Sequence, residues 1–113
     1  MKKFLLFIFA IFIVDFFVFA ASPKSENSLF EEISSAYENG FYPGVVKQAE
    51  NFLKKYPSSE LLEKVLCLEG ESYFKISKFA QAKNVLSRAL EKLSDDDLKL
   101  QATYYLARAC YEL

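Results

Sequence analysis

Histidine and tryptophan are both missing from the 113-residue sequence. Without histidine no Ser-His-Asp triad can form, and the most frequent metal-binding side chain is lost. The glycines, Gly40, Gly44 and Gly70, are too few and too scattered to form a loop that cradles phosphate. A net charge of −1 gives no basic excess for nucleic acid. The sequence therefore predicts a protein that is not an enzyme, has no cofactor or metal, and binds no nucleic acid.

Cysteine is scarce as well, since Cys67 and Cys110 are the two thiols. Neither has a second cysteine nearby in the sequence, which argues against a metal or redox site. Their places in successive predicted helices differ by ~9 Å along the axis, too far for a disulfide. We expect two unpaired, buried side chains, and the alternative is pairing with another chain.

The acidic residues form no recognisable catalytic or metal-binding set. Asp95, Asp96 and Asp97 lack the alternating ligands and the glycine of a calcium loop, so they are predicted to cap a helix. Glu69 and Glu71 are two residues apart on a predicted helix and point to different sides. We expect each of them to have a structural or surface role.

Phenylalanine is abundant, and seven of its twelve copies lie in the opening stretch. Two initial lysines precede an apolar run from Phe4 to Val14, and small residues follow at Ala20 and Ala21. This order is typical of a secretory signal, so residues 1–20 are predicted to be a signal peptide that is cleaved before Ala21. An uncleaved anchor is the alternative, because this segment is just long enough to cross a bilayer. Asp15 disfavours the anchor, since a charge at the centre of a membrane helix costs roughly 2.5–3.5 kcal/mol.

The rest of the chain reads as a polar linker at residues 21–27 and a helical domain at residues 28–113. Ser28 and Glu31 have the spacing of a capping box and predict the start of a first helix, which Gly40 ends. Pro43 is predicted to begin a second helix, since its fixed φ suits the first turn, and Pro57 to end it.

Three further helices are predicted. Ser58 or Ser59 would cap the third, which runs to about Ile76, and Phe79 would open the fourth. The fifth would span 98–113 behind an aspartate N-cap. Apolar residues recur at three- and four-residue steps, and no strand pattern follows the opening segment. The fold class is therefore all-α.

A repeat of 37 residues relates the predicted helices to one another. It places Leu53 on Leu90 and Gly70 on Ala107. Self-similarity at such a period indicates stacked structural repeats. Gly70 lies inside a helix at a cost of ~1 kcal/mol relative to alanine, and we expect close approach of another helix to offset it.

The pattern Gly70-x-x-Tyr73-Phe74, Phe79-x-x-Ala82, Ala89-Leu90 resembles the tetratricopeptide repeat. This resemblance implies tandem antiparallel helix–turn–helix units, an α-solenoid of about two and a half repeats that binds other proteins. The phrase 52–59 is similar to repeats of bacterial envelope proteins, among them Tol-Pal accessory proteins and outer-membrane assembly lipoproteins. It implies a scaffold in the periplasm or cell envelope of a bacterium. No cysteine near Ala20 could carry a lipid, which departs from the lipoproteins.

In that family the first helix of each pair lines a concave, peptide-binding face. The register carries this role to two sets of residues here, Lys64, Cys67, Glu71 and Lys75, and Tyr104, Arg108 and Glu112. Some members grip a terminal carboxylate with lysine and asparagine. Cys67 and Glu71 stand at those places, so we expect a different class of peptide or protein partner.

Two alternatives to an exported scaffold stay open. The chain could be a membrane-anchored structural subunit of an envelope complex, or the N-terminal fragment of a longer array. Tyr104, Tyr105 and Tyr111 keep the last helix aromatic where a terminal helix is usually polar. Self-association through this helix is therefore a further prediction.

Overall fold

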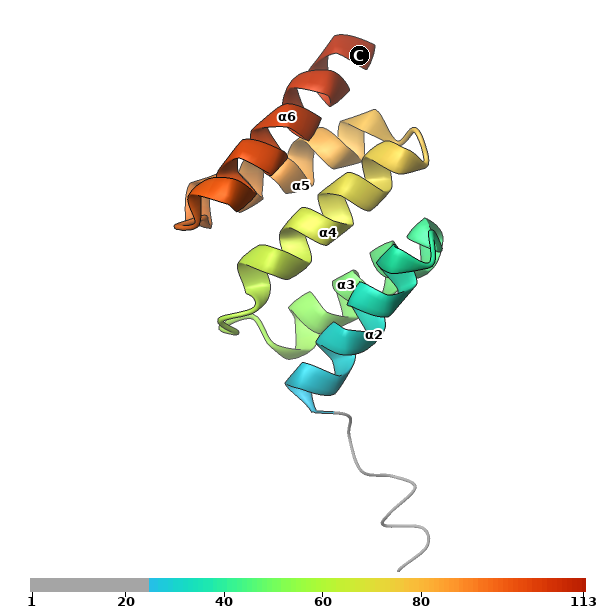
Figure 1. Ribbon diagram of the computed structural model, residues 1–113, viewed down its shortest axis with the longest axis vertical. Helices are drawn as coiled ribbons and strands as arrows, with labels where there is room; N and C mark the ends of the chain where they lie inside the picture. Colours follow the sequence, from blue (N-terminus) through green and yellow to red (C-terminus); the bar gives the residue numbers. More distant parts are fainter. Residues whose placement is uncertain (1–24) are drawn as a thin grey trace, which may run out of the picture.

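The computed structural model describes residues 25–113, and the predicted signal, anchor and most of the linker lie outside them. This part of the chain is all helix and turn, without strands, which confirms the predicted fold class (Figure 1). Among these helices none is long and apolar enough to cross a membrane. The five are α2 (Glu26–Glu38), α3 (Tyr42–Lys55), α4 (Leu62–Lys75), α5 (Phe79–Lys92) and α6 (Asp96–Glu112).

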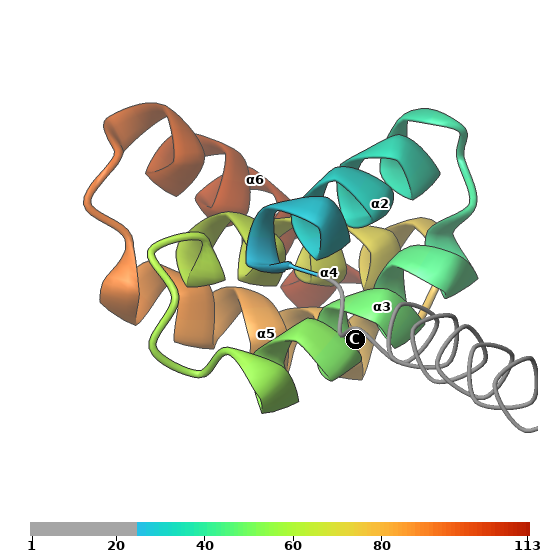
Figure 2. The same ribbon diagram turned by 90° about the horizontal axis from the view of Figure 1, so that it is seen from below.

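The helices pack in two layers, and consecutive helices lie side by side in roughly opposite directions (Figures 1 and 2). One layer contains α2, α4 and α6, and the other contains α3 and α5. Helix α4 also contacts both α2 and α6, whereas within the described residues α2 and α6 do not meet. Helix α4 therefore forms the floor between two walls.

The 37-residue spacing found in the sequence also relates the ends of the helices to one another. Helix α3 spans Tyr42–Lys55 and α5 spans Phe79–Lys92, so both bounds differ by 37. The last residues of α2, α4 and α6, namely Glu38, Lys75 and Glu112, follow the same spacing. The described part of the chain thus consists of two similar helical hairpins and a further helix.

Two hydrophobic clusters hold these elements together, and α4 contributes to both. The first lies between α2, α3 and α4, and the second between α4, α5 and α6. Burial of apolar surface is the main favourable term, at about 25 cal/mol per Å². Fully buried members are Ile33, Val45, Ala49, Phe52 and Val65 in the first cluster, and Leu66, Ala82, Leu86, Ala89, Ala102 and Ala109 in the second.

Two predicted helix starts were wrong. Ser25 caps α2 by accepting a hydrogen bond from the Ser28 amide at 3.2 Å, so Ser28 lies inside the first turn. The earlier cap lengthens the helix, and the Leu29 amide donates to the Ser25 carbonyl. Helix α4 begins at Leu62, because the chain after Ser59 first makes a turn.

Two other helix starts follow the sequence signals. Pro43 occupies the first turn of α3, as predicted. Asp95 is the N-cap of α6 and accepts a hydrogen bond from the Leu98 amide at 3.0 Å. These signals worked because each depends on backbone geometry within one turn.

Gly70 does bring two helices together. A β-carbon built there would lie 2.5 Å from Cδ2 of Leu86 on α5, closer than real side chains approach. Ala82 and Ala89 are fully buried in the same hairpin. Ala107, which the repeat places at the position of Gly70, is exposed on α6, so the close packing that the repeat implies for a small residue there is absent.

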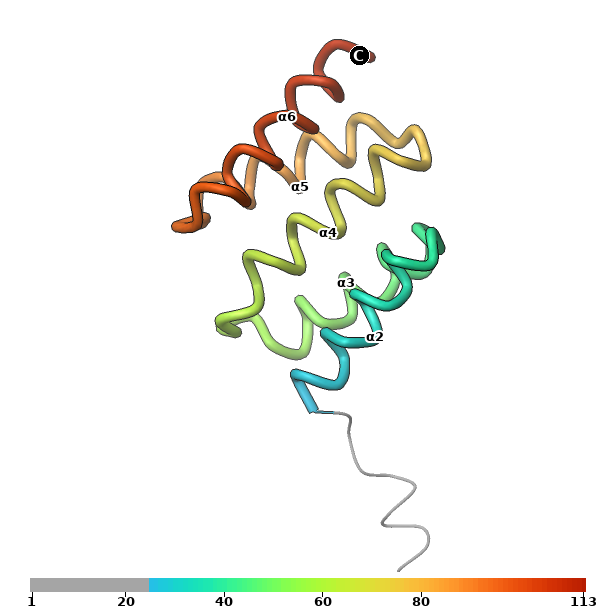
Figure 3. The backbone as a smooth tube through the Cα atoms, in the orientation of Figure 1, coloured from blue at the N-terminus to red at the C-terminus, as the bar shows by residue number. Residues whose placement is uncertain are grey.

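The turns after α2 and α4 are built alike, and they lie at the same side of the molecule (Figure 3). Gly40 and Ser77, 37 residues apart, both have positive φ, at 73° and 63°. The amides of Phe41 and Lys78 close the turns by donating to the carbonyls of Ala36 and Tyr73 at 2.9 Å. This bonding pattern is a Schellman motif, in which glycine is the favoured residue.

Exchanging the residues at these two turns should change stability in opposite directions. Ser77→Gly is expected to raise the free energy of unfolding by about 1 kcal/mol, because side chains disfavour the left-handed region. Gly40→Ser should lower it by about 1 kcal/mol. A β-carbon at Gly40 meets nothing within 4 Å, so the loss reports backbone strain alone. Urea unfolding followed by circular dichroism measures the stability of both variants. Changes of the same sign would contradict the assignment of these two turns as equivalent left-handed turns.

Candidate functional site

A groove lies along α4 between α2 and α6. Figure 2 shows these three helices in one layer. The cavity of the groove is about 240 Å³ and is lined by all three helices of this layer. Of the residues predicted to face a partner, Lys64, Cys67 and Glu71 line it. The walls add Phe30 and Tyr37 from α2 and Gln101 from α6.

Glu71 lies at the floor of this groove and is 1% exposed. The Tyr37 hydroxyl of α2 donates a hydrogen bond to Oε2 of Glu71 at 2.6 Å, which ties α2 to α4. Burial raises the pKa of the Glu71 carboxyl, while the bond from Tyr37 and the charge of Lys75 partly oppose this. Burial and the nearby carboxylate also raise the pKa of Tyr37. Of the structural and surface roles expected for Glu71, its burial and its bond to Tyr37 indicate the structural one.

The two cysteines have different environments. Cys67 is buried, and burial, with smaller contributions from Glu71 and Glu63, raises the pKa of its thiol to about 11. A thiol of this kind stays protonated at neutral pH and is a weak nucleophile. Cys110 is exposed, which corrects the prediction that both are buried, because no described helix covers its face of α6. Both thiols are free, as predicted.

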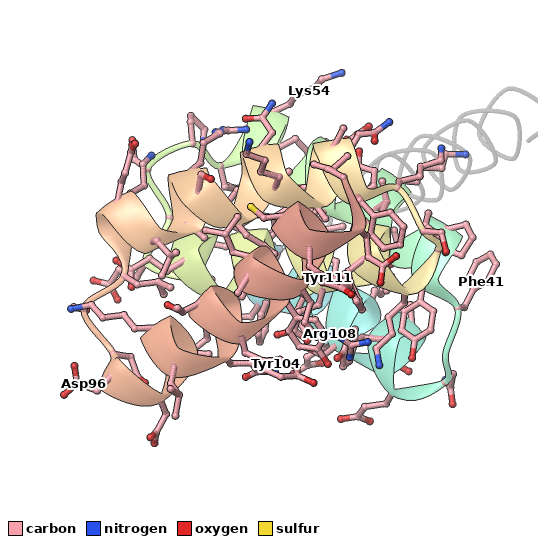
Figure 4. All side chains as sticks on the ribbon, turned by 90° about the horizontal axis from the view of Figure 1, so that it is seen from above. Phe41, Lys54, Asp96, Tyr104, Arg108 and Tyr111 are labelled. Carbon is pink, nitrogen blue, oxygen red and sulfur yellow. The ribbon has the colours of Figure 1, made fainter. Side chains whose placement is uncertain are left out.

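Cations and aromatic rings gather where α4 and α6 end. The guanidinium of Arg108 lies 4.9 Å from the ring centroid of Phe74, and its Nη1 donates to the Tyr104 hydroxyl at 3.2 Å. The amine of Lys75 lies 5.7 Å from the ring centroid of Tyr105. Figure 4 shows Arg108 and Tyr104 on the same side of α6. The structure therefore brings Lys75, Tyr104 and Arg108 together beside the groove. Lys64 lines the groove near the start of α4, and Glu112 is exposed at the end of α6.

A second cavity, of about 380 Å³, lies in the other layer between α3 and α5. Glu69 of α4 reaches it and is 3% exposed, and its Oε2 is buried without a hydrogen-bond partner. Next to it the Tyr73 hydroxyl donates to Oε1 of Glu50 at 2.8 Å. Glu69 and Glu71 thus point to different sides of α4, as predicted, but both are buried. The position of Glu69 directly before Gly70, on the side of the helix where close packing was predicted, was the sequence signal for its burial, and it was missed.

Burial raises the pKa of Glu69 to about 7, with Glu50 adding to the shift and Arg88 opposing it. The folded protein therefore holds this proton more tightly than the unfolded chain does. Between about pH 4.5 and 7 the unfolded chain loses the proton first, so stability is highest below this range and falls as pH rises through it. The expected loss is about 3 kcal/mol.

Glu69→Gln removes the titrating group and should flatten this part of the pH profile. We expect the variant to gain stability relative to the natural protein as pH rises from 4.5 to 7. Urea midpoints at several pH values measure the difference. Glu91→Gln, an exposed glutamate on α5, controls for the loss of a charge. If the stability of Glu69→Gln and of the natural protein changed in parallel with pH, the raised pKa of Glu69 would be contradicted.

Within residues 25–113 no three histidine, cysteine, aspartate or glutamate side chains are grouped so that they could hold a metal ion. Two of the cavities in residues 25–113 thus lie on opposite layers, and the linings of both contain acidic and basic side chains. No protein-family model, curated protein or solved structure matches the chain.

Proposed function

We propose that the protein is a non-enzymatic interaction scaffold of the tetratricopeptide-repeat type. The observation that carries the proposal is the groove between α2, α4 and α6, which the hairpins form by repeating at 37 residues. A layer of successive first helices with a hollow along it suits an extended polypeptide. The small side chains at 70, 82 and 89 support the repeat interpretation, since they are buried where helices pack closely.

The charges beside the groove favour an acidic partner segment. Lys64, Lys75 and Arg108 are exposed, while the Glu71 carboxyl is buried at the floor and accepts a hydrogen bond from Tyr37. Glu38 is an exposed acid in the lining. Phe30, Leu68 and the ring of Tyr37 offer apolar surface between these charges. An extended segment with acidic and apolar side chains therefore complements the groove.

Site-specific photocrosslinking in the cell envelope tests the proposal. A photoreactive residue at Gln101, in the groove, is expected to capture a defined partner, whereas one at Lys83, exposed on α5, is not. Reversing the charges with Lys75→Glu and Arg108→Glu should weaken capture by about tenfold, because attraction becomes repulsion. Equal capture at both positions, or capture that ignores the charge reversal, would contradict the groove as the binding face.

We further propose that the scaffold works in the periplasm or cell envelope after removal of residues 1–20. The basic, apolar and small-residue order of that segment supports this. The N-terminal sequence of the protein recovered from cells tests it. A chain that begins at Ala21 or Ser22 is expected. A chain that keeps the opening segment would favour the membrane-anchored structural subunit instead.

Self-association is a second candidate function, and the exposed face of α6 favours it. Leu100, Tyr104 and Tyr111 are exposed there, and Tyr111 is the counterpart of Phe74, which packs on Phe79 in the preceding hairpin. We propose a second copy of the chain as the occupant. Sedimentation velocity should show a dimer that Tyr111→Lys disrupts, and a monomer at all concentrations would refute it.

A further inference from the structure

The cavity between α3 and α5 lies on the layer opposite the proposed groove, so its role is separate from that of the groove. Its volume is about 380 Å³, and α4 forms its back. Four ionisable side chains besides Tyr73 face it. They are Glu50 and Lys54 on α3, Glu69 on α4 and Arg88 on α5.

Glu69 is the feature that requires explanation. It is 3% exposed and lines the cavity, yet its Oε2 has no hydrogen-bond partner. Burial of an ionised carboxylate without a partner is strongly unfavourable. Tyr73 does not relieve it, because its hydroxyl donates to Glu50. Arg88 acts on Glu69 through its charge, and neither Arg88 nor Lys54 forms a hydrogen bond with this oxygen.

We propose that the cavity between α3 and α5 is a binding site for a primary ammonium group, with Glu69 as its counter-ion. The acceptors belong to separate side chains on two helices, Glu50 on α3 and Glu69 and Tyr73 on α4. An ammonium is compact and has three diverging donors, which can serve such a set. A planar guanidinium is instead suited to a single carboxylate whose two oxygens are both free, so it matches these separate acceptors less well.

A divalent metal ion fits these residues less well. Calcium takes six to eight oxygen ligands, and magnesium demands near-octahedral geometry. The described residues offer no group of three acidic, histidine or cysteine ligands, and two cationic side chains border the cavity. A monovalent cation requires fewer ligands and is repelled less.

Binding should depend on pH in a definite direction. The ammonium requires an ionised Glu69, whose pKa burial raises to about 7, with Glu50 adding and Arg88 opposing. Binding should therefore strengthen as pH rises through this range and release a proton. The ammonium group could come from a free amine or from a lysine side chain of a partner protein.

The experiment follows the carboxyl carbon of Glu69 by NMR in the chain as recovered from cells. At pH 8, n-butylammonium chloride and a lysine-containing peptide are titrated against it, with tetramethylammonium chloride at equal ionic strength as control. We expect a saturable shift with the primary amines and at least a tenfold weaker response to tetramethylammonium, which has no donor. Tenfold tighter binding of the peptide would identify a polypeptide source, and equal binding a free amine.

Two variants keep the proposal open to refutation. In Glu69→Gln and in the natural protein binding is also followed through the side-chain amide signals of Gln81 and Asn84, which line the cavity. Glu69→Gln should abolish saturation of these signals while the far-ultraviolet dichroism shows a folded chain, and Glu50→Gln, at an exposed position, should weaken binding by several fold. The proposal fails if tetramethylammonium acts as strongly as the primary amines, or if Glu69→Gln binds them unchanged. It also fails if the primary amines leave the signal of the Glu69 carboxyl carbon unshifted at pH 8.

Discussion

Phe52→Ala is expected to lower the free energy of unfolding by about 3–5 kcal/mol. Within residues 25–113 Phe52 is the largest fully buried side chain, and its ring centroid lies 5.4 Å from that of Tyr56. Truncation removes its buried apolar surface and leaves a cavity among α2, α3 and α4 that the surrounding helices cannot fill completely. Because small domains are stable by roughly 5–15 kcal/mol in total, this single change should bring the fold close to unfolding.

Phe41→Ala provides the matched control, since Phe41 is the same residue type at 62% exposure. We expect it to cost less than about 1 kcal/mol. Urea unfolding followed by circular dichroism compares the two midpoints, and an unchanged slope would show that the same surface is exposed on unfolding. Similar losses for both variants would mean that Phe52 does not anchor the first cluster.

Sequence reasoning located the helices well because their signals are local. The apolar steps of three and four residues, Pro43 and the aspartate before α6 each act within one or two turns. The glycine inside α4 also correctly indicated a close neighbour. Ser28 misled because Ser25 offers the same hydroxyl three residues earlier, and the longer helix wins.

The sites were harder to predict, because they depend on which helices come together. Tyr37 and Glu71 are 34 residues apart, and nothing near either one in the sequence announces their hydrogen bond. Glu69 reads as a surface residue until α3 and α5 close around it. Cys110 shows the opposite error, since the repeat pattern predicts burial but no described helix covers it. Of the residues predicted to face a partner, Lys64, Cys67 and Glu71 line the groove, and the burial of Glu71 there depends on its contact with α2.

Gly70→Ile and Leu86→Ala are each expected to be strongly destabilising, and the double variant should recover most of the loss. Leu86 is fully buried, so its truncation should cost about 2–5 kcal/mol. A β-carbon at Gly70 would lie 2.5 Å from Cδ2 and 2.6 Å from Cγ of Leu86, so isoleucine overpacks the interface by about 1–3 kcal/mol or more. The two changes act on the same space, and their coupling energy should reach about 2–3 kcal/mol.

The first hairpin supplies the reason to expect this recovery. Subtracting 37 from Gly70 and Leu86 gives Ile33 and Ala49, both fully buried. In the first hairpin the large residue, Ile33, is on the first helix and the small one, Ala49, is on the second. In the second hairpin the small residue is on the first helix, so the same backbone arrangement accepts either order. The double variant therefore imposes on α4 and α5 a pair that the chain already uses. Ala107→Ile, at the exposed counterpart on α6, controls for isoleucine in a helix and should change stability by less than about 1 kcal/mol. If urea unfolding showed that the stability losses of Gly70→Ile and Leu86→Ala simply add in the double variant, the two hairpins would not share this packing arrangement.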